Sequence, residues 1–206
     1  MINWGILGTG AIAKAFADAL QDTEGNLIAV ASNSLSRAEE FSSSYGCNPV
    51  EGYNNLISLQ NVDAIYVATP HPSHFYLTSE CLKNHKAVLC EKPMTINATE
   101  TMALIDLSRK NNTLLMEAFM YKLHPQTKKV AEIVKEKLNS PLNIKAEFCF
   151  SVDVPKTHRL VNKVLGGGSI LDIGCYPVSM ARHITGVLNN KNFLNPVSIE
   201  GNGELN

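Results

Sequence analysis

The sequence lacks the features that mark several classes of protein. Its 206 residues carry 18 Lys and Arg against 19 Asp and Glu, so no excess of positive charge predicts nucleic-acid binding. No apolar run approaches the length of a membrane span, and no charged signal-peptide region precedes the first apolar segment. The five cysteines are widely spaced and form no Cys-x-x-Cys pair, which is typical of reduced thiols. We therefore expect a cytoplasmic protein that binds neither nucleic acid nor membranes.

Short apolar segments alternate with helical patterns over residues 1–120. This alternation predicts a dinucleotide-binding domain with a Rossmann-type, doubly wound parallel sheet. The expected strands are 4–7, 27–31, 49–50, 64–68, 87–90 and 114–118.

A glycine-rich turn directly follows the first expected strand. Gly8, Gly10 and Ala13 form the pattern Gly-x-Gly-x-x-Ala, and an amphipathic helical segment follows. Gly8 permits a tight turn, and Gly10 lets the backbone approach a pyrophosphate. The amides of Ala11 and Ile12 then offer a helix amino terminus to the phosphates. A glycine turn without a ligand remains the alternative.

The end of the second expected strand favours NADP over NAD. Ser32 and Asn33 occupy the place where an NAD-binding domain carries an acidic residue for the ribose hydroxyl, and Arg37 follows one helical turn later. Neutral groups and an arginine would tolerate and pair a 2′-phosphate. If Ser34 or Ser36 merely caps the next helix and Arg37 is solvated, the choice between the two cofactors stays open.

Two further strand ends contribute candidates at the same edge of the sheet. Thr69, Pro70, His71 and His74 follow the fourth strand, where they could line a cofactor cleft or simply begin a surface helix. The two histidines have a spacing that could bind metal, but no third ligand accompanies them, so no metal site is expected.

After the fifth strand, Glu91 and Lys92 precede Pro93, which has no amide hydrogen and holds the lysine extended at the strand's carboxyl end. Ligands bind at this edge in open α/β sheets. A solvated lysine paired with Glu91 is the alternative.

Residues 121–206 have a different pattern. Apolar and polar residues alternate strictly over 144–152 and again over 197–200, which predicts antiparallel strands. Because two strands do not make a stable sheet, we expect an incomplete α+β domain with an antiparallel or mixed open-faced sheet.

Between these segments, three glycines at 166–168 permit close approach by a ligand or another backbone. Asp172 and Tyr176 follow, four residues apart, and could act as an acid/base pair. A capping box from Ser169 to Asp172 and an ordinary half-buried Tyr176 are the alternatives.

Taken together, these motifs resemble the glucose-fructose oxidoreductase, inositol dehydrogenase and rhizopine-catabolism family, called Gfo/Idh/MocA. The glycine turn, the turn at 68–74, Glu91-Lys92-Pro93 and the Gly-Gly-Gly…Asp-x-Gly-x-Tyr run lie in the family's order. Tyr176-Pro177 and Glu117-Ala118 resemble its dihydrodiol dehydrogenase and NADP-dependent xylose dehydrogenase branch.

The resemblance implies NAD(P)-dependent oxidation of a secondary alcohol in a sugar or cyclic diol. It implies that Lys92 contacts the nicotinamide ribose and the substrate, that Tyr176 with Asp172 handles the proton, and that the full-length form is a homo-oligomer. A dinucleotide-sensing protein without catalysis, or a truncated inactive family member, remains the alternative.

Overall fold

The computed structural model describes residues 1–138 and 143–202, which divide into two compact units. The first unit comprises Met1–Phe119 together with Lys156–Gly168, and the second comprises Met120–Pro155 and Ser169–Asn206. The segment 156–168 thus packs with the first unit, although it lies within the sequence range predicted for a second domain.

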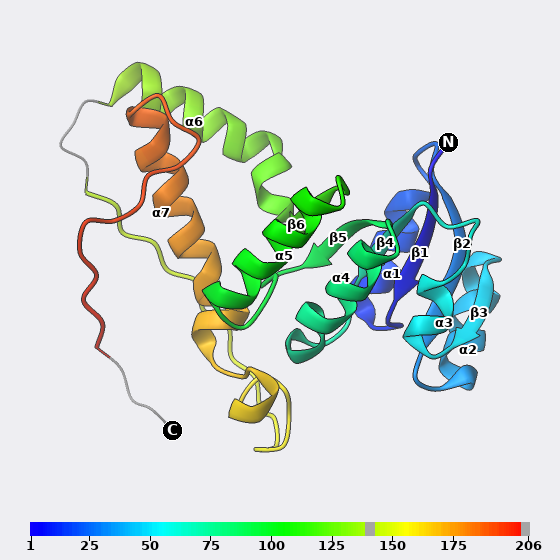
Figure 1. Ribbon diagram of the computed structural model, residues 1–206. Helices are drawn as coiled ribbons and strands as arrows, with labels where there is room; N and C mark the ends of the chain where they lie inside the picture. Colours follow the sequence, from blue (N-terminus) through cyan, green and yellow to red (C-terminus); the bar gives the residue numbers. More distant parts are fainter. Residues whose placement is uncertain (139–142, 203–206) are drawn as a thin grey trace. The chain divides into compact units, whose positions relative to one another are not determined.

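The first unit is built on a six-stranded sheet (Figure 1). The strands lie in the order β3-β2-β1-β4-β5-β6, and each neighbouring pair is parallel. They are β1 (Asn3–Leu7), β2 (Asn26–Ser32), β3 (Asn48–Glu51), β4 (Ala64–Val67), β5 (Ala87–Glu91) and β6 (Leu115–Ala118). This confirms the predicted doubly wound fold. The strand order reverses between β1 and β4, which is where such sheets bind ligands at their carboxyl edge.

Helices cover both faces of this sheet. They are α1 (Ala11–Leu20), α2 (Leu35–Tyr45), α3 (Tyr53–Ile57), η1 (His71–Ser73), α4 (His74–Lys83) and α5 (Ala98–Lys110). One buried cluster joins α1 and α2 to Tyr66 of β4, and another joins α3, α4 and α5 to Ile65 and Val67. Because consecutive strand residues point to opposite faces, β4 contributes to both clusters. The sheet is therefore buried on both sides, as its apolar strands predict.

The second unit is helical or irregular where the structure describes it. The short η2 (Met120–Leu123) precedes α6 (Pro125–Lys137), and a π-helical turn, η4 (Ile170–Gly174), leads into α7 (Cys175–Leu188). Helices α6 and α7 pack against each other (Figure 1). Val134 and Ile184 are its buried hydrophobic residues, against more than twenty in the first unit.

The two antiparallel strands predicted from alternation are absent from the structure. Within residues 1–138 and 143–202, no strand follows β6. Phe148, Phe150 and Val152 are 46%, 51% and 51% exposed, and Val197 is fully exposed. Alternation indicates which face of a strand is apolar, but a strand forms only where a neighbour takes its backbone hydrogen bonds. No described segment pairs with either of these two.

The expectation about membrane spans also needs a correction. A window within Lys163–Leu188 has a mean hydropathy of 1.2 and is long and apolar enough to cross a membrane by length and composition alone. Helices of water-soluble domains pass the same test. The segment includes Gly166, Gly167 and Gly168, and lies partly in each unit.

Candidate active site and cofactor-binding edge

The glycine turn between β1 and α1 has the conformation that a phosphate site requires. Gly8 has φ +108°, and a Cβ there would lie 2.7 Å from the carbonyl oxygen of Ala68. Gly10 is the N-cap of α1, with no side-chain cap, and a Cβ at Gly10 would meet no atom within 4 Å. The first turn of α1, which holds Ala11 and Ile12, is thus left open to an anion. The turn fits the pyrophosphate of a dinucleotide.

The carboxyl end of β2 carries no acidic residue of its own, since Ser32, Asn33 and Ser34 follow one another there. Ser32 is buried, and its carbonyl accepts a hydrogen bond from the Gly52 amide at 2.8 Å. Asn33 and Arg37 are exposed. Ser34 is the N-cap residue of α2 but makes no side-chain cap bond, since its hydroxyl lies 3.0 Å from that of Ser36. The side chains therefore do not form the helix cap that was the alternative explanation for these serines.

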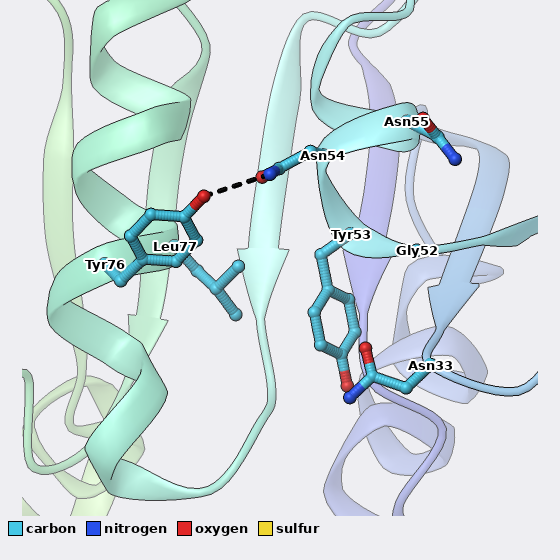
Figure 2. A pocket seen from close by; sticks show the side chains of 7 residues that line it. All are labelled: Asn33, Gly52, Tyr53, Asn54, Asn55, Tyr76 and Leu77. Carbon is cyan, nitrogen blue, oxygen red and sulfur yellow. Dashed lines mark hydrogen bonds between the residues drawn. The ribbon is translucent and has the colours of Figure 1, made fainter.

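A cavity of about 320 Å³ opens beside Asn33 (Figure 2). Nδ2 of Asn54 donates to the Tyr76 hydroxyl at 3.0 Å and joins α3 to α4 across it. Burial raises the pKa of Tyr53, and the nearby charge of Arg37 opposes this shift. No carboxylate lines the cavity, whose lining residues are Asn33, Gly52, Tyr53, Asn54, Asn55, Tyr76 and Leu77.

The turn after β4 is held by a buried histidine. Thr69 and His71 are buried, whereas Pro70 is exposed. His74 has no exposed surface: its Nε2 lies 2.7 Å from the carbonyl of Thr69, and its Nδ1 lies 2.9 Å from that of Pro93. Its ring is thus enclosed by protein, which corrects the prediction that His74 lines the cofactor cleft. His74 instead joins the turns that follow β4 and β5.

Burial is the main reason why the pKa of His74 lies below its ordinary value. The two carbonyl contacts and the charge of Glu91 oppose this shift, and the charge of Lys92 adds to it. A neutral imidazole has one N–H, so it donates to one of the two carbonyls, whereas an imidazolium would donate to both.

Lys92 lies half-buried immediately beyond β5, at the carboxyl edge that also holds the glycine turn. The Tyr66 hydroxyl donates to Oε1 of Glu91 at 2.5 Å, and the Lys92 amide donates to Oε2 of the same carboxylate at 3.1 Å. The peptide bond between Lys92 and Pro93 is cis. The Glu91 carboxylate therefore binds the backbone of Lys92 and Tyr66 of the neighbouring strand.

Two of the three glycines at 166–168 lie close to other parts of the first unit. A Cβ at Gly167 would lie 2.7 Å from the carbonyl oxygen of Arg159, so this position needs close approach of another backbone. Gly166 has φ +68°, and its Cβ would lie 3.3 Å from Cγ2 of Ile96 and 3.6 Å from Cβ of His71. The segment 156–168 therefore lies against the loops that follow β4 and β5.

Asp172 and Tyr176 belong to the second unit. Asp172 lies in η4, and Tyr176 lies in the first turn of α7. Ser169 makes no side-chain cap bond at the start of η4, so the expected alternative of a capping box is not formed. π-Helical turns such as η4 are frequent at functional sites.

Sequence reasoning missed the aromatic surroundings of Tyr176. Its ring centroid lies 5.9 Å from that of Tyr121 and 5.5 Å from that of Phe148. The Tyr121 hydroxyl donates to Oγ of Ser179 at 2.8 Å. Tyr121 follows β6 closely, and this position after a strand was the available signal.

The structure gathers most of the predicted cofactor residues at one edge of one sheet. Gly8, Gly10, Thr69 and Lys92 follow the carboxyl ends of its strands, and Ser32 is the last residue of β2. No group of three or more metal-ligating side chains occurs among residues 1–138 and 143–202.

Comparison with known proteins agrees with this fold. Residues 2–119 match the GFO/IDH/MocA family, described as an oxidoreductase family with an NAD-binding Rossmann fold. The chain belongs to this family. Its sheet order and glycine turn are those that such a fold requires.

Relatives match the chain over most of its length. It is 35% identical to a trans-1,2-dihydrobenzene-1,2-diol dehydrogenase of Xenopus tropicalis over 98% of the chain and 61% of the relative. It is also 35% identical to a D-xylose 1-dehydrogenase (NADP(+)) of Haloferax volcanii over 89% of the chain and 57% of the relative. The chain therefore spans about three fifths of the length of these relatives.

Solved structures give the same result. A 3-ketoreductase from Actinomadura kijaniata, in complex with NADP and TDP-benzene, superimposes with a TM-score of 0.80 at 32% identity. The match covers 90% of this chain and 57% of the reductase.

Proposed function

We propose that the chain carries the cofactor-binding and hydride-transfer part of an NADP-dependent oxidoreductase. Its substrate would be a secondary alcohol of a sugar or a cyclic diol, or the corresponding ketone. The observation that carries the proposal is the position of Lys92, on an anchored loop at the carboxyl edge that also holds the glycine turn. Family membership and the names of the relatives above support it.

The cofactor, when bound, supplies the carbon that accepts or donates hydride. Gly8, Gly10, Ala11 and Ile12 would hold its pyrophosphate through backbone amides. Beyond them, the adenosine end would lie near the following residues at the ends of β2 and β4: Ser32, Asn33, Arg37, Thr69, Pro70 and His71. Arg37 and the absence of a carboxylate in the cavity beside Asn33 favour NADP over NAD.

Three side chains would perform the proton chemistry. Tyr176 would take the proton of the substrate hydroxyl in oxidation and return it in reduction. The ammonium of Lys92 would favour the phenolate of Tyr176, because an opposite charge within about 4–6 Å stabilises the ionised form. Asp172 would orient the tyrosine or receive its proton. This arrangement requires the second unit to bring Tyr176 to Lys92.

The experiment that tests the proposal replaces Lys92. Lys92→Met keeps much of the side-chain length and removes the charge that would keep Tyr176 ionised. Hydride transfer should therefore fall by roughly 100-fold or more, because Tyr176 would no longer act as a general base. Binding of NADPH, measured by its fluorescence, should persist. Lys83→Met is a matched control, because Lys83 is a surface residue paired with Glu80 at 2.7 Å. Equal turnover in both variants would refute the role of Lys92.

Cofactor binding without turnover is the second candidate function. The observation that favours it is the scarcity of buried residues in the second unit, which holds Tyr176 and Asp172. Saturable NADPH binding together with no oxidation of any sugar or diol would support it, and steady NADPH production would exclude it. The homo-oligomeric state and cytoplasmic location expected from the sequence also stay proposals, which sedimentation and cell fractionation would test.

A further inference from the structure

Residues 91–94, the lysine loop, are held by hydrogen bonds at each residue after Glu91. The Lys92 amide donates to Oε2 of Glu91 at 3.1 Å, and the Pro93 carbonyl lies 2.9 Å from Nδ1 of His74. The Met94 amide donates to Oε1 of Glu117 at 2.7 Å. The three bonds reach the end of β5, the first turn of α4 and β6 respectively.

The bond from Met94 to Glu117 links the lysine loop to the side chain of a neighbouring strand. Pro93 has no amide hydrogen, so the Met94 amide is the first backbone donor after Lys92. Its acceptor is a carboxylate, which makes a stronger hydrogen bond than a neutral acceptor. Glu117 pairs in register with Cys90 on the neighbouring strand, and this register places its carboxylate beside the loop. The Met94 side chain packs against the buried cluster on the α4 side. The backbone amide and the side chain of Met94 are therefore both held in place.

We propose that Glu117 is a positioning residue for Lys92. It acts through the backbone of the lysine loop, and it exchanges no proton with the substrate. The inference rests on the proposed function only for the role of Lys92, because the anchoring itself is a property of the folded first unit. Misplacing a reacting group by about 1 Å can cost about 100-fold in rate, so an anchor at this point matters for catalysis.

Two variants separate anchoring from charge. Glu117→Leu removes the acceptor at similar size, whereas Glu117→Gln keeps a side-chain oxygen that can accept from the Met94 amide. Asp63→Leu is the matched control. Oδ2 of Asp63 accepts from the Asn3 amide at 2.9 Å, at the amino-terminal ends of the strands of the same sheet. All three variants remove a carboxylate that binds a backbone amide of the first unit.

The readouts are amide hydrogen exchange at Met94, the dissociation constant of NADPH, and kcat and KM. With Glu117→Leu, we expect exchange at Met94 to become about tenfold faster or more, because the opening of that bond no longer costs free energy. We also expect kcat to fall about tenfold or more with little change in NADPH binding. In Glu117→Gln, the exchange rate at Met94 and kcat should both stay within about threefold of the unaltered protein. Asp63→Leu should leave exchange at Met94 unchanged.

Slow exchange at Met94 in Glu117→Leu would overturn the proposal, as would Glu117→Gln behaving like Glu117→Leu, since charge would then be decisive. The exchange measurement needs no turnover. If the unaltered protein oxidised no sugar or diol, that result would count against the proposed function. The exchange rate at Met94 would still test whether Glu117 anchors the lysine loop.

Discussion

At the scale of single residues, His74 makes the stability of the first unit depend on pH. Its pKa is lowered in the folded protein, mainly by burial, so the unfolded chain takes up a proton more readily. The contribution of His74 to stability is therefore fully present above the pKa of the unfolded chain, about 6.5. It is lost as the pH falls from there toward the lower pKa of the folded protein.

His74→Gln should remove this contribution. Urea unfolding of both proteins between pH 5 and pH 8 measures it, and the difference between the two free energies of unfolding should change by at most about 1.4 kcal/mol per pH unit below about pH 6.5. A difference that is constant with pH would contradict the assignment, even if the substitution lowers stability overall.

Single residues also show how far the sequence could predict the site. The positions of Gly8, Gly10 and Lys92 at the carboxyl ends of strands were predictable, because each follows an apolar strand in a short local motif. Their roles in binding and catalysis stay predictions. His74 and Glu117 were not assigned their observed contacts, because those contacts join segments 19 and 23 residues apart in the chain. Only the folded sheet brings such segments together.

At the scale of elements, helix starts with similar cap residues differ in how they are held. The Asn97 side chain accepts from the Glu100 amide at 2.9 Å at the start of α5. Ser34 stands at the same position of α2 but makes no side-chain cap bond. An N-cap contributes stability by satisfying one of the free amides of the first turn.

Asn97→Ala should therefore lower the free energy of unfolding by about 1 kcal/mol, whereas Ser34→Ala should change it by about half of that or less. Chemical denaturation followed by circular dichroism measures both. Equal losses in the two variants would show that the observed cap bond contributes nothing of its own.

The prediction of the parallel strands was right and the prediction of two antiparallel strands was wrong, and both outcomes have one physical reason. β1, β4 and β5 are apolar on both faces and have neighbours on both sides within the first unit, so local pattern and tertiary pairing agree. The segments at 144–152 and 197–200 have a strand pattern on their own, but no described segment pairs with them. Periodicity is a property of one segment, whereas pairing requires two.

At the scale of the whole molecule, the two units differ in how much apolar surface they bury. The first unit has a buried cluster on each face of its sheet, whereas Val134 and Ile184 are the buried hydrophobic residues in the described part of the second. Because apolar burial is the main favourable term in folding, the first unit should be the more stable of the two.

The single tryptophan allows this difference to be measured. Trp4 lies in β1, with its ring centroid 5.2 Å from that of Phe16, so its fluorescence reports on the first unit alone. Far-ultraviolet circular dichroism also reports on α6 and α7. On heating, we expect the part of the helical signal that comes from α6 and α7 to be lost before the tryptophan signal changes.

NADPH should then raise the midpoint temperature of the tryptophan transition and leave that of the earlier helical transition unchanged. At a concentration 100 times its dissociation constant, a ligand that binds only the folded unit stabilises it by about 2.7 kcal/mol. For a unit of this size that corresponds to a shift of roughly 10 °C. If both signals changed at one temperature and moved together with NADPH, the two units would unfold as one, and Lys92 and Tyr176 would belong to a single cooperative structure.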